Sequence, residues 1–166
     1  MRPSEPPFAL CGPRGALVAD RVQARFCDVP AAEAVLRSGA APILLGALPF
    51  DVNAPAALMV PDTVLRTGAL SEWPTAPLPT VRITAEVPIR DDHRDRIRRA
   101  REELTAPGSP LQKVVLARAL ELTADAPLDG RVILRRLLDA DPTAYGYLVD
   151  LTPAGDRYRG AALVGA

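Results

Sequence analysis

Short apolar runs alternate along the chain with segments whose apolar residues recur at helical spacing. The helical segments predict helices near residues 30–38, 91–105 and 128–140. The short runs, bounded by glycine and proline, predict strands over 8–11, 16–19, 22–26, 42–48, 56–60, 63–66, 111–122, 143–151 and 158–164. Proline-rich residues 72–80 are expected to form an extended connector. The pattern predicts an α+β fold of mainly antiparallel strands, with 56–60 and 63–66 as a pair and the helices on one side.

Charged residues dominate the second predicted helix. Asp91 or Asp92 is expected to cap it, and Arg98 lies four residues before Glu102, the spacing of a helical ion pair. A solvated face of paired charges and an anion-binding patch both fit this arginine-rich run, and the flanking acidic residues favour the first. His93 falls in the first turn and is expected at the surface.

Composition narrows the class of protein. The 166 residues are 48% hydrophobic, enough for one folded core, and the 20 basic and 20 acidic residues cancel, so bulk charge favours neither nucleic acid nor an anionic membrane. The apolar stretches are too short to span a bilayer, and the first residues lack the apolar core of a signal peptide. Cys11 and Cys27 have no metal-binding spacing, so a reduced, cytoplasmic protein is expected. Motifs of P-loops, zinc sites and nucleophile elbows are missing from the sequence.

One residue stands out chemically. Of the twenty Lys and Arg residues only Lys113 is a lysine, and it lies in the apolar run Leu111–Arg118. Arginine stays charged, whereas a desolvated lysine loses its proton more readily and serves as a base. On a strand Lys113 shares a face with Val115, and covering both faces would lower its pKa. The alternative is a strand lysine whose stem lies on the surface while its ammonium reaches water.

The run LQKVVLAR, residues 111–118, closely resembles the Q-K-V-V-L-[AS]-R block of isochorismate synthases. Three weaker stretches agree with that family in order and spacing. They are GALPFD at 46–51, DPTAY at 141–145, similar to the family's N-P-x-x-Y turn, and residues 160–166, similar to the strand that leads into its G-A-S-P-E motif. The resemblance runs from about Phe8 onward.

This resemblance implies a chorismate-utilising enzyme of the aminodeoxychorismate synthase-like α+β fold, in which large, mainly antiparallel sheets pack across one another with helices outside. It further implies that the substrate is chorismate and that Mg²⁺ is needed. In such enzymes a lysine acts as general base, activating the water that attacks the ring, while a glutamate opposite acts as general acid for the departing 4-hydroxyl. Lys113 matches the base by position.

The chain stops at Gly165-Ala166, where the family continues with S-P-E. By resemblance, the general acid and both Mg²⁺-binding glutamates lie beyond this point. Residues 1–166 are therefore expected to be a truncated, N-terminal portion of a single chorismate-binding domain. Lys113 is its one predicted site residue, with no metal-binding or cofactor-binding residue. Such a piece is expected to be inactive alone and to self-associate through open strand edges.

Three functions remain open at the level of sequence. The first is isochorismate synthase, an isomerase serving siderophore or quinone biosynthesis. The second is salicylate synthase, which shares the lysine and adds pyruvate elimination. The third, of another class, is a noncatalytic binding or assembly domain that keeps the family's strands.

Overall fold

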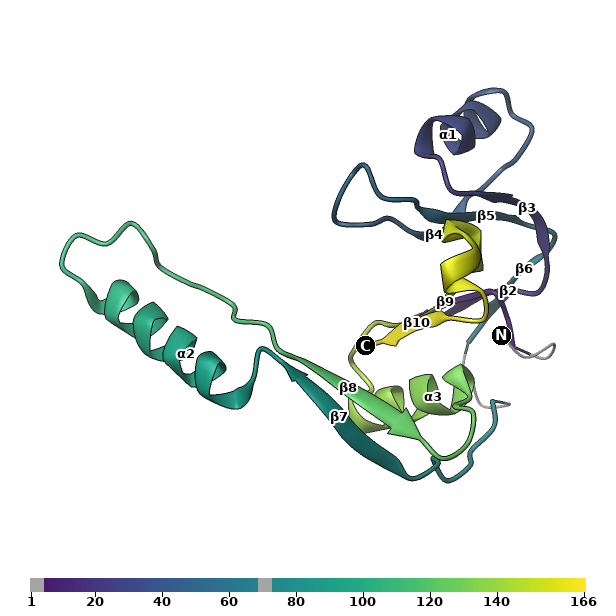
Figure 1. The fold of residues 1–166 in the computed structure, drawn as a ribbon. Coiled ribbons are helices and arrows are strands. Elements are labelled where there is room, and N and C mark those ends of the chain that lie inside the picture. Colours follow the sequence, from purple (N-terminus) through teal and green to yellow (C-terminus); the bar gives the residue numbers. More distant parts are fainter. Residues whose placement is uncertain (1–4, 69–72) are drawn as a thin grey trace. The chain divides into compact units, whose positions relative to one another are not determined.

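The structure, a computed structural model, describes residues 5–68 and 73–166. The chain divides into two compact units: unit 1 is Met1–Leu78 with Asp129–Ala166, and unit 2 is Pro79–Leu128. Every strand pair in the described residues is antiparallel, and helices occur in both units (Figure 1). The predicted α+β class is confirmed.

Unit 1 contains two sheets. The five-stranded sheet has the order β10-β9-β1-β2-β6, with β1 (Phe8–Gly12), β2 (Gly15–Ala19), β6 (Val64–Thr67), β9 (Gly146–Asp150) and β10 (Ala162–Gly165). The three-stranded sheet has the order β3-β5-β4, with β3 (Val22–Phe26), β4 (Leu45–Ala47) and β5 (Ala57–Pro61). The helices of this unit are α1 (Val29–Arg37) and α3 (Gly130–Ala140), and two 3₁₀ turns, Thr152–Ala154 and Asp156–Tyr158, connect β9 to β10.

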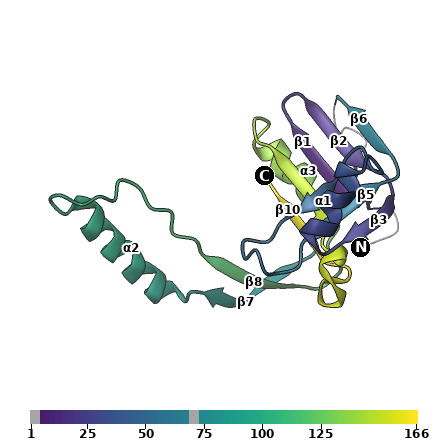
Figure 2. The same cartoon turned by 90° about the horizontal axis from the view of Figure 1, so that it is seen from above.

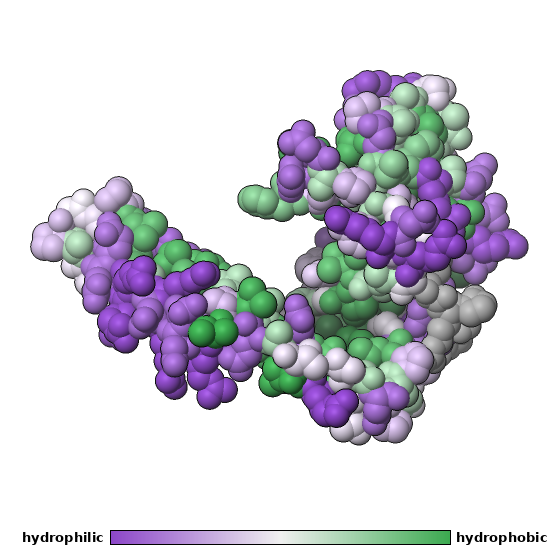
Figure 3. All heavy atoms as spheres, in the orientation of Figure 1, coloured by the Kyte–Doolittle hydropathy of each residue, from purple (hydrophilic) through white to green (hydrophobic). Residues whose placement is uncertain are grey.

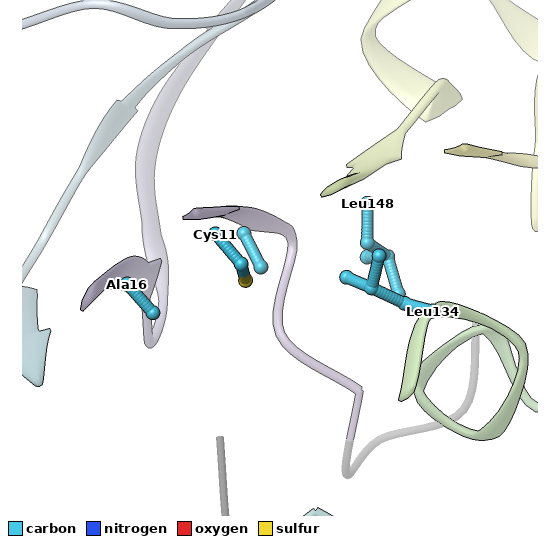
Figure 4. Packing of buried hydrophobic residues seen from close by; sticks show 5 residues of the cluster. Cys11, Ala16, Leu134 and Leu148 are labelled. Carbon is cyan, nitrogen blue, oxygen red and sulfur yellow. The ribbon is translucent and has the colours of Figure 1, made fainter. Parts of the chain in front are cut away.

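Buried side chains lie on both faces of the five-stranded sheet. On one face Cys11, Ala16 and Leu148 pack with Leu134 of α3 (Figure 4). On the other face Phe8 and Val149, among other residues, pack with residues of the three-stranded sheet. This follows from strand geometry, because successive side chains point to opposite faces. Helix α1 contacts β3 and β5, and α1 and α3 lie on opposite sides of the two sheets in Figure 1. The helices are thus outside, as expected, but the prediction that they share one side is wrong.

Two glycines permit close approaches within unit 1. At Gly146 a Cβ atom would lie 2.6 Å from the Leu134 Cδ1 atom, so glycine lets α3 sit directly on β9. Gly46 has a φ of +147°, and a Cβ there would lie 1.9 Å from the Ala57 carbonyl oxygen of the neighbouring strand. The glycine of the GALPFD stretch is therefore required by sheet pairing.

Helix α3 begins in a cluster of charged side chains. Asp129 is the N-cap: its carboxylate accepts bonds from the Arg131 backbone N–H at 2.9 Å and from the Arg131 guanidinium at 2.8 Å. The Arg131 side-chain bonds are the main cause that lowers the pKa of Asp129 to about 2. Buried Glu5 accepts a bond from the Gly130 N–H at 3.1 Å. These bonds satisfy backbone donors in the first turn of the helix.

Unit 2 is a helix inserted in a hairpin: β7 (Val81–Val87), α2 (Arg90–Thr105) and β8 (Ala119–Ala124). Strand β7 was not predicted from the sequence. Its alternating apolar residues are exposed, with Ile83 58% and Val87 54% accessible. Helix α2 begins one residue earlier than predicted, and its N-cap is Ile89, so neither Asp91 nor Asp92 caps it.

Several predicted strands differ in detail. The run 42–48 is a strand only over Leu45–Ala47, and 143–151 only over Gly146–Asp150. The predicted strand at 158–164 begins at Ala162, because the 3₁₀ turns occupy the preceding residues. The runs 56–60 and 63–66 form strands but do not pair with each other: β5 pairs with β3 and β4, and β6 with β2. Residues 73–80 are irregular as expected, and Glu72 lies outside the described residues.

Candidate active-site segment

The segment that carries Lys113 starts at a tight turn after α2. Gly108 has a φ of +79°. The Ser109 N–H donates to the Ala106 carbonyl at 3.1 Å, and its hydroxyl accepts from the Leu111 N–H at 3.2 Å. The predicted break at residues 107–110 therefore reverses the chain, which runs back along α2 toward β8 (Figures 1 and 2).

Residues 111–118 are not a strand in this structure. The β7–β8 ladder ends at the pair Val87 and Ala119, so the described part of the chain offers no strand opposite the residues before Ala119. The prediction of a strand over 111–122 is thus wrong for its first eight residues and right for the rest. The local β propensity of Lys113-Val114-Val115 is real, but a strand also needs a hydrogen-bonded neighbour.

Lys113 is exposed and makes no hydrogen bond or ion pair with any other described residue. Val115, two positions on, is 79% exposed, whereas Leu116 is half-buried. Within unit 2 the two faces of the segment are not both covered, so the condition under which Lys113 would be desolvated is not met there. The Lys113 side chain is therefore accessible to a ligand or to another protein segment.

A charged cluster holds the other end of the segment. The Glu86 carboxylate of β7 forms an ion pair with the Arg118 guanidinium at 2.6 Å and a longer one with Arg90 at 3.8 Å. Glu86 lies on the strand that sequence analysis did not predict, and the alternation Val81-Arg82-Ile83 would have been the signal for that strand. This cluster links the last residue before β8 to β7 and to the start of α2.

Helix α2 carries its charges on a solvated face, as predicted. Arg94 pairs with Asp91 at 3.7 Å, and Arg98 pairs with Asp95 at 2.7 Å rather than with Glu102. Figure 3 shows hydrophilic residues gathered along one side of this helix. His93 is half-buried rather than fully at the surface, and its Nδ1 atom is buried without a hydrogen-bond partner among the described residues.

The other stretches of the family resemblance lie in unit 1. Gly46 belongs to β4, and the same stretch ends in an exposed loop in which Phe50 is 106% accessible. Tyr145 of the DPTAY turn packs its ring against Gly12 in the β1–β2 hairpin. In residues 5–68 and 73–166, no group of three or more His, Cys, Asp or Glu side chains is placed to hold a metal ion.

Two further features concern the chemical environment. Among the residues described, no helix is both long and apolar enough to cross a bilayer. Cys11 and Cys27 are both free thiols, and burial raises the pKa of Cys11 to about 11. That shift disfavours the thiolate, so Cys11 serves the core of unit 1 rather than chemistry.

Comparisons with known proteins agree with the resemblance. A provisionally named isochorismate synthase, MenF from Mycobacterium tuberculosis, is 69% identical over 162 residues, which are 98% of this chain and 44% of that protein. The isochorismate synthase EntC of Escherichia coli is 29% identical over 121 residues, covering 69% of this chain and 30% of EntC. The chain thus spans less than half the length of the curated relatives it matches. No family model matches the sequence.

The fold has a counterpart among solved structures. The provisionally assigned 2,3-dihydroxybenzoate-specific isochorismate synthase DhbC from Bacillus anthracis superposes with a TM-score of 0.64 at 22% identity, covering 91% of this chain and 41% of DhbC. Together these matches confirm that the chain resembles isochorismate synthases, and that its fold is the one seen in such an enzyme.

Proposed function

We propose, from the premise that this chain is related to isochorismate synthases, that it forms part of an enzyme converting chorismate to isochorismate. The observation that carries the proposal is the lysine block at 111–118 within a 69% identical match to MenF. In this role Lys113 accepts a proton from the water that attacks the ring, while the 4-hydroxyl departs with a proton from a general acid. Water is both added and released, so the overall reaction is an isomerisation.

The base role places a demand on the surroundings of Lys113. A general base works best when its pKa lies near the operating pH, and desolvation of a lysine moves it in that direction. Since Lys113 is exposed in this chain, we propose that the working enzyme covers it with groups other than the described residues. We likewise propose, from the resemblance, that the enzyme uses Mg²⁺.

Substitution of Lys113 tests this function. The experiment uses a protein that contains these 166 residues and is as long as the relatives described above. Lys113→Ala is expected to lower isochorismate formation by about 10²–10⁴-fold, the typical contribution of general-base catalysis. Lys113→Arg is expected to be nearly as damaging, because a guanidinium keeps its proton. The matched control is Arg99→Lys, an exposed exchange on α2 that is expected to leave turnover unchanged.

Product chromatography and thermal stability are measured together in this experiment. Turnover of Lys113→Arg within a few-fold of the parent would contradict the base role. No turnover by the parent protein itself would favour a noncatalytic binding or assembly domain, a reading with which the exposure of Lys113 agrees. Salicylate accompanied by pyruvate would identify the alternative enzyme that shares the lysine. Either enzyme is expected in the cytoplasm, in keeping with the two free thiols.

We also propose that the 166-residue chain associates with itself. Strands β10 and β6 are the outer strands of the five-stranded sheet, and the edge of an outer strand is where a second copy can add a strand. Light scattering over a series of concentrations is expected to give a mass that rises above 17.7 kDa. A constant monomer mass at high concentration would contradict this.

A further inference from the structure

Glu86 joins three segments at the point where the Lys113 segment enters the sheet. We propose that Glu86 is a positioning residue for Lys113, acting through its ion pair with Arg118. This inference rests on the proposed function of Lys113 and extends it to a residue of a different strand. Glu86 is not expected to touch the substrate, and its effect on the reaction is indirect.

The cluster differs from the surface ion pairs of α2. The side chains of Glu86 and Arg118 are 25% and 28% exposed, whereas those of Asp95 and Arg98 are 47% and 67% exposed. Water screens the Glu86–Arg118 pair less, so it is expected to hold its geometry more firmly than a typical surface pair. Its 2.6 Å separation is that of a charge-assisted contact.

The position of the Lys113 segment depends on its two ends. Residues 111–118 have no ladder partner among the described residues, and Lys113 itself makes no bond that would fix it. One end is set by the turn at Gly108 and the other by Arg118, which comes immediately before β8. Lys113 lies five positions before Arg118, about 17 Å away if the segment is extended. If Arg118 moves relative to β8, the segment 111–118 moves with it and Lys113 is displaced.

Such a displacement matters for a general base. The base must lie within hydrogen-bond reach of the proton that it removes, and small misplacements lower the rate without removing the group itself. Loss of the Glu86 carboxylate is thus expected to lower kcat while leaving binding of chorismate nearly unchanged. A residue that served only the folding stability of unit 2 would not produce that separation.

The contribution of the Glu86–Arg118 ion pair is tested first on the 166-residue chain, with a measurement that does not depend on activity. Hydrogen exchange of the amides in Ala119–Ala124 is compared in the parent, Glu86→Gln, Arg118→Gln and the double variant. Each single change is expected to speed exchange about fivefold. The double variant is expected to exchange no faster than Glu86→Gln alone, because that change already removes the pair with Arg118 as well as the longer pair with Arg90. Arg118→Lys, which keeps the charge, and Asp95→Asn, which breaks an exposed pair of α2, are the controls and are expected to match the parent.

The second part of the experiment measures kinetics in a protein that contains this chain and is as long as its relatives. Glu86→Gln is expected to lower kcat about tenfold with KM for chorismate within about twofold, and Arg118→Lys to restore most of the loss seen in Arg118→Gln. Unchanged exchange in both neutral variants, or an unchanged kcat in Glu86→Gln, would overturn the positioning role while a loss of turnover in Lys113→Ala leaves the proposed function standing. Turnover retained by Lys113→Ala would instead overturn the base role of Lys113, and the positioning role of Glu86 with it.

Discussion

The two units of this chain bury the apolar residues of their helices and strands very differently. In unit 1, Leu134 of α3 and Leu148 of β9 are 0% and 1% exposed because a helix covers one sheet face and a second sheet the other. In unit 2, neither α2 nor the two strands contain a buried residue, and Ile97 in the apolar stripe of α2 is 39% exposed. An apolar stripe predicts the element, and a facing layer decides whether the stripe becomes core.

The proposed base lies in the less covered unit. Segments with few buried contacts open and move at low energetic cost, and binding and catalytic residues are often found on them. A lysine packed against a filled core would already be shielded from water. Lys113 is exposed, and we propose that groups other than the described residues cover it in the working enzyme. The contrast between the units can be tested at three levels of effect.

The largest expected effect concerns activity. The 166-residue chain with chorismate and Mg²⁺ is expected to form no more isochorismate than a blank without protein. Lys113 is exposed, and the described residues form no metal site, so unit 2 lacks the environment that the reaction needs. The measurement is product chromatography over a long incubation. Turnover well above the blank would show that the contrast in burial has no bearing on function.

The next effect concerns folding stability. Leu134→Ala in unit 1 is expected to lower the free energy of unfolding by about 2–5 kcal/mol, because it leaves a cavity in a filled core. Ile97→Ala in unit 2 is the matched change on the exposed stripe and is expected to cost less than about 1 kcal/mol. Urea denaturation of both variants, followed by far-UV circular dichroism, gives the comparison. Equal losses would mean that unit 2 has a core comparable to that of unit 1.

The smallest expected effect concerns the N-cap of α3 in unit 1. Asp129→Ala at the N-cap of α3 is expected to cost about 1–2 kcal/mol at pH 7. The pKa of Asp129 is lowered from its ordinary value of 3.8 to about 2, mainly by the Arg131 side chain. The stabilisation is therefore present above about pH 4 and is lost as the pH falls toward 2.

Denaturation of this variant and the parent between pH 2 and pH 7 checks the prediction for Asp129. Asp28→Ala is the matched control, since Asp28 caps α1 through the Ala31 N–H at 2.8 Å with no ion pair to any other described residue. It is expected to cost less at pH 7, about 0.5–1 kcal/mol. A loss for Asp129→Ala that stays constant down to pH 2 would contradict the role of the Arg131 contact.

Sequence patterns were most reliable where the signal is local. The helices begin and end within about two residues of their predicted bounds, because spacing of apolar residues and stop signals such as Gly39 act within a few turns. Strand pairing was harder to predict from the sequence. Nothing local to β5 and β6 shows that these neighbours in sequence join different sheets. The candidate site was found only as a residue, Lys113, and its exposure was one of two alternatives that the sequence left open. The ion pair of Glu86 with Arg118 was not foreseen.

The sequence by itself determined the helices and most of the strands, the α+β class and the lysine block that marks the resemblance to isochorismate synthases. Each of these depends on residues close together in the chain. Tertiary structure alone decided which strands pair, which stripes are covered, and that Lys113 stands exposed before the start of β8. The physical reason is that strand pairing and desolvation both require partners distant in sequence, and a residue's own neighbours do not specify what will lie across from it.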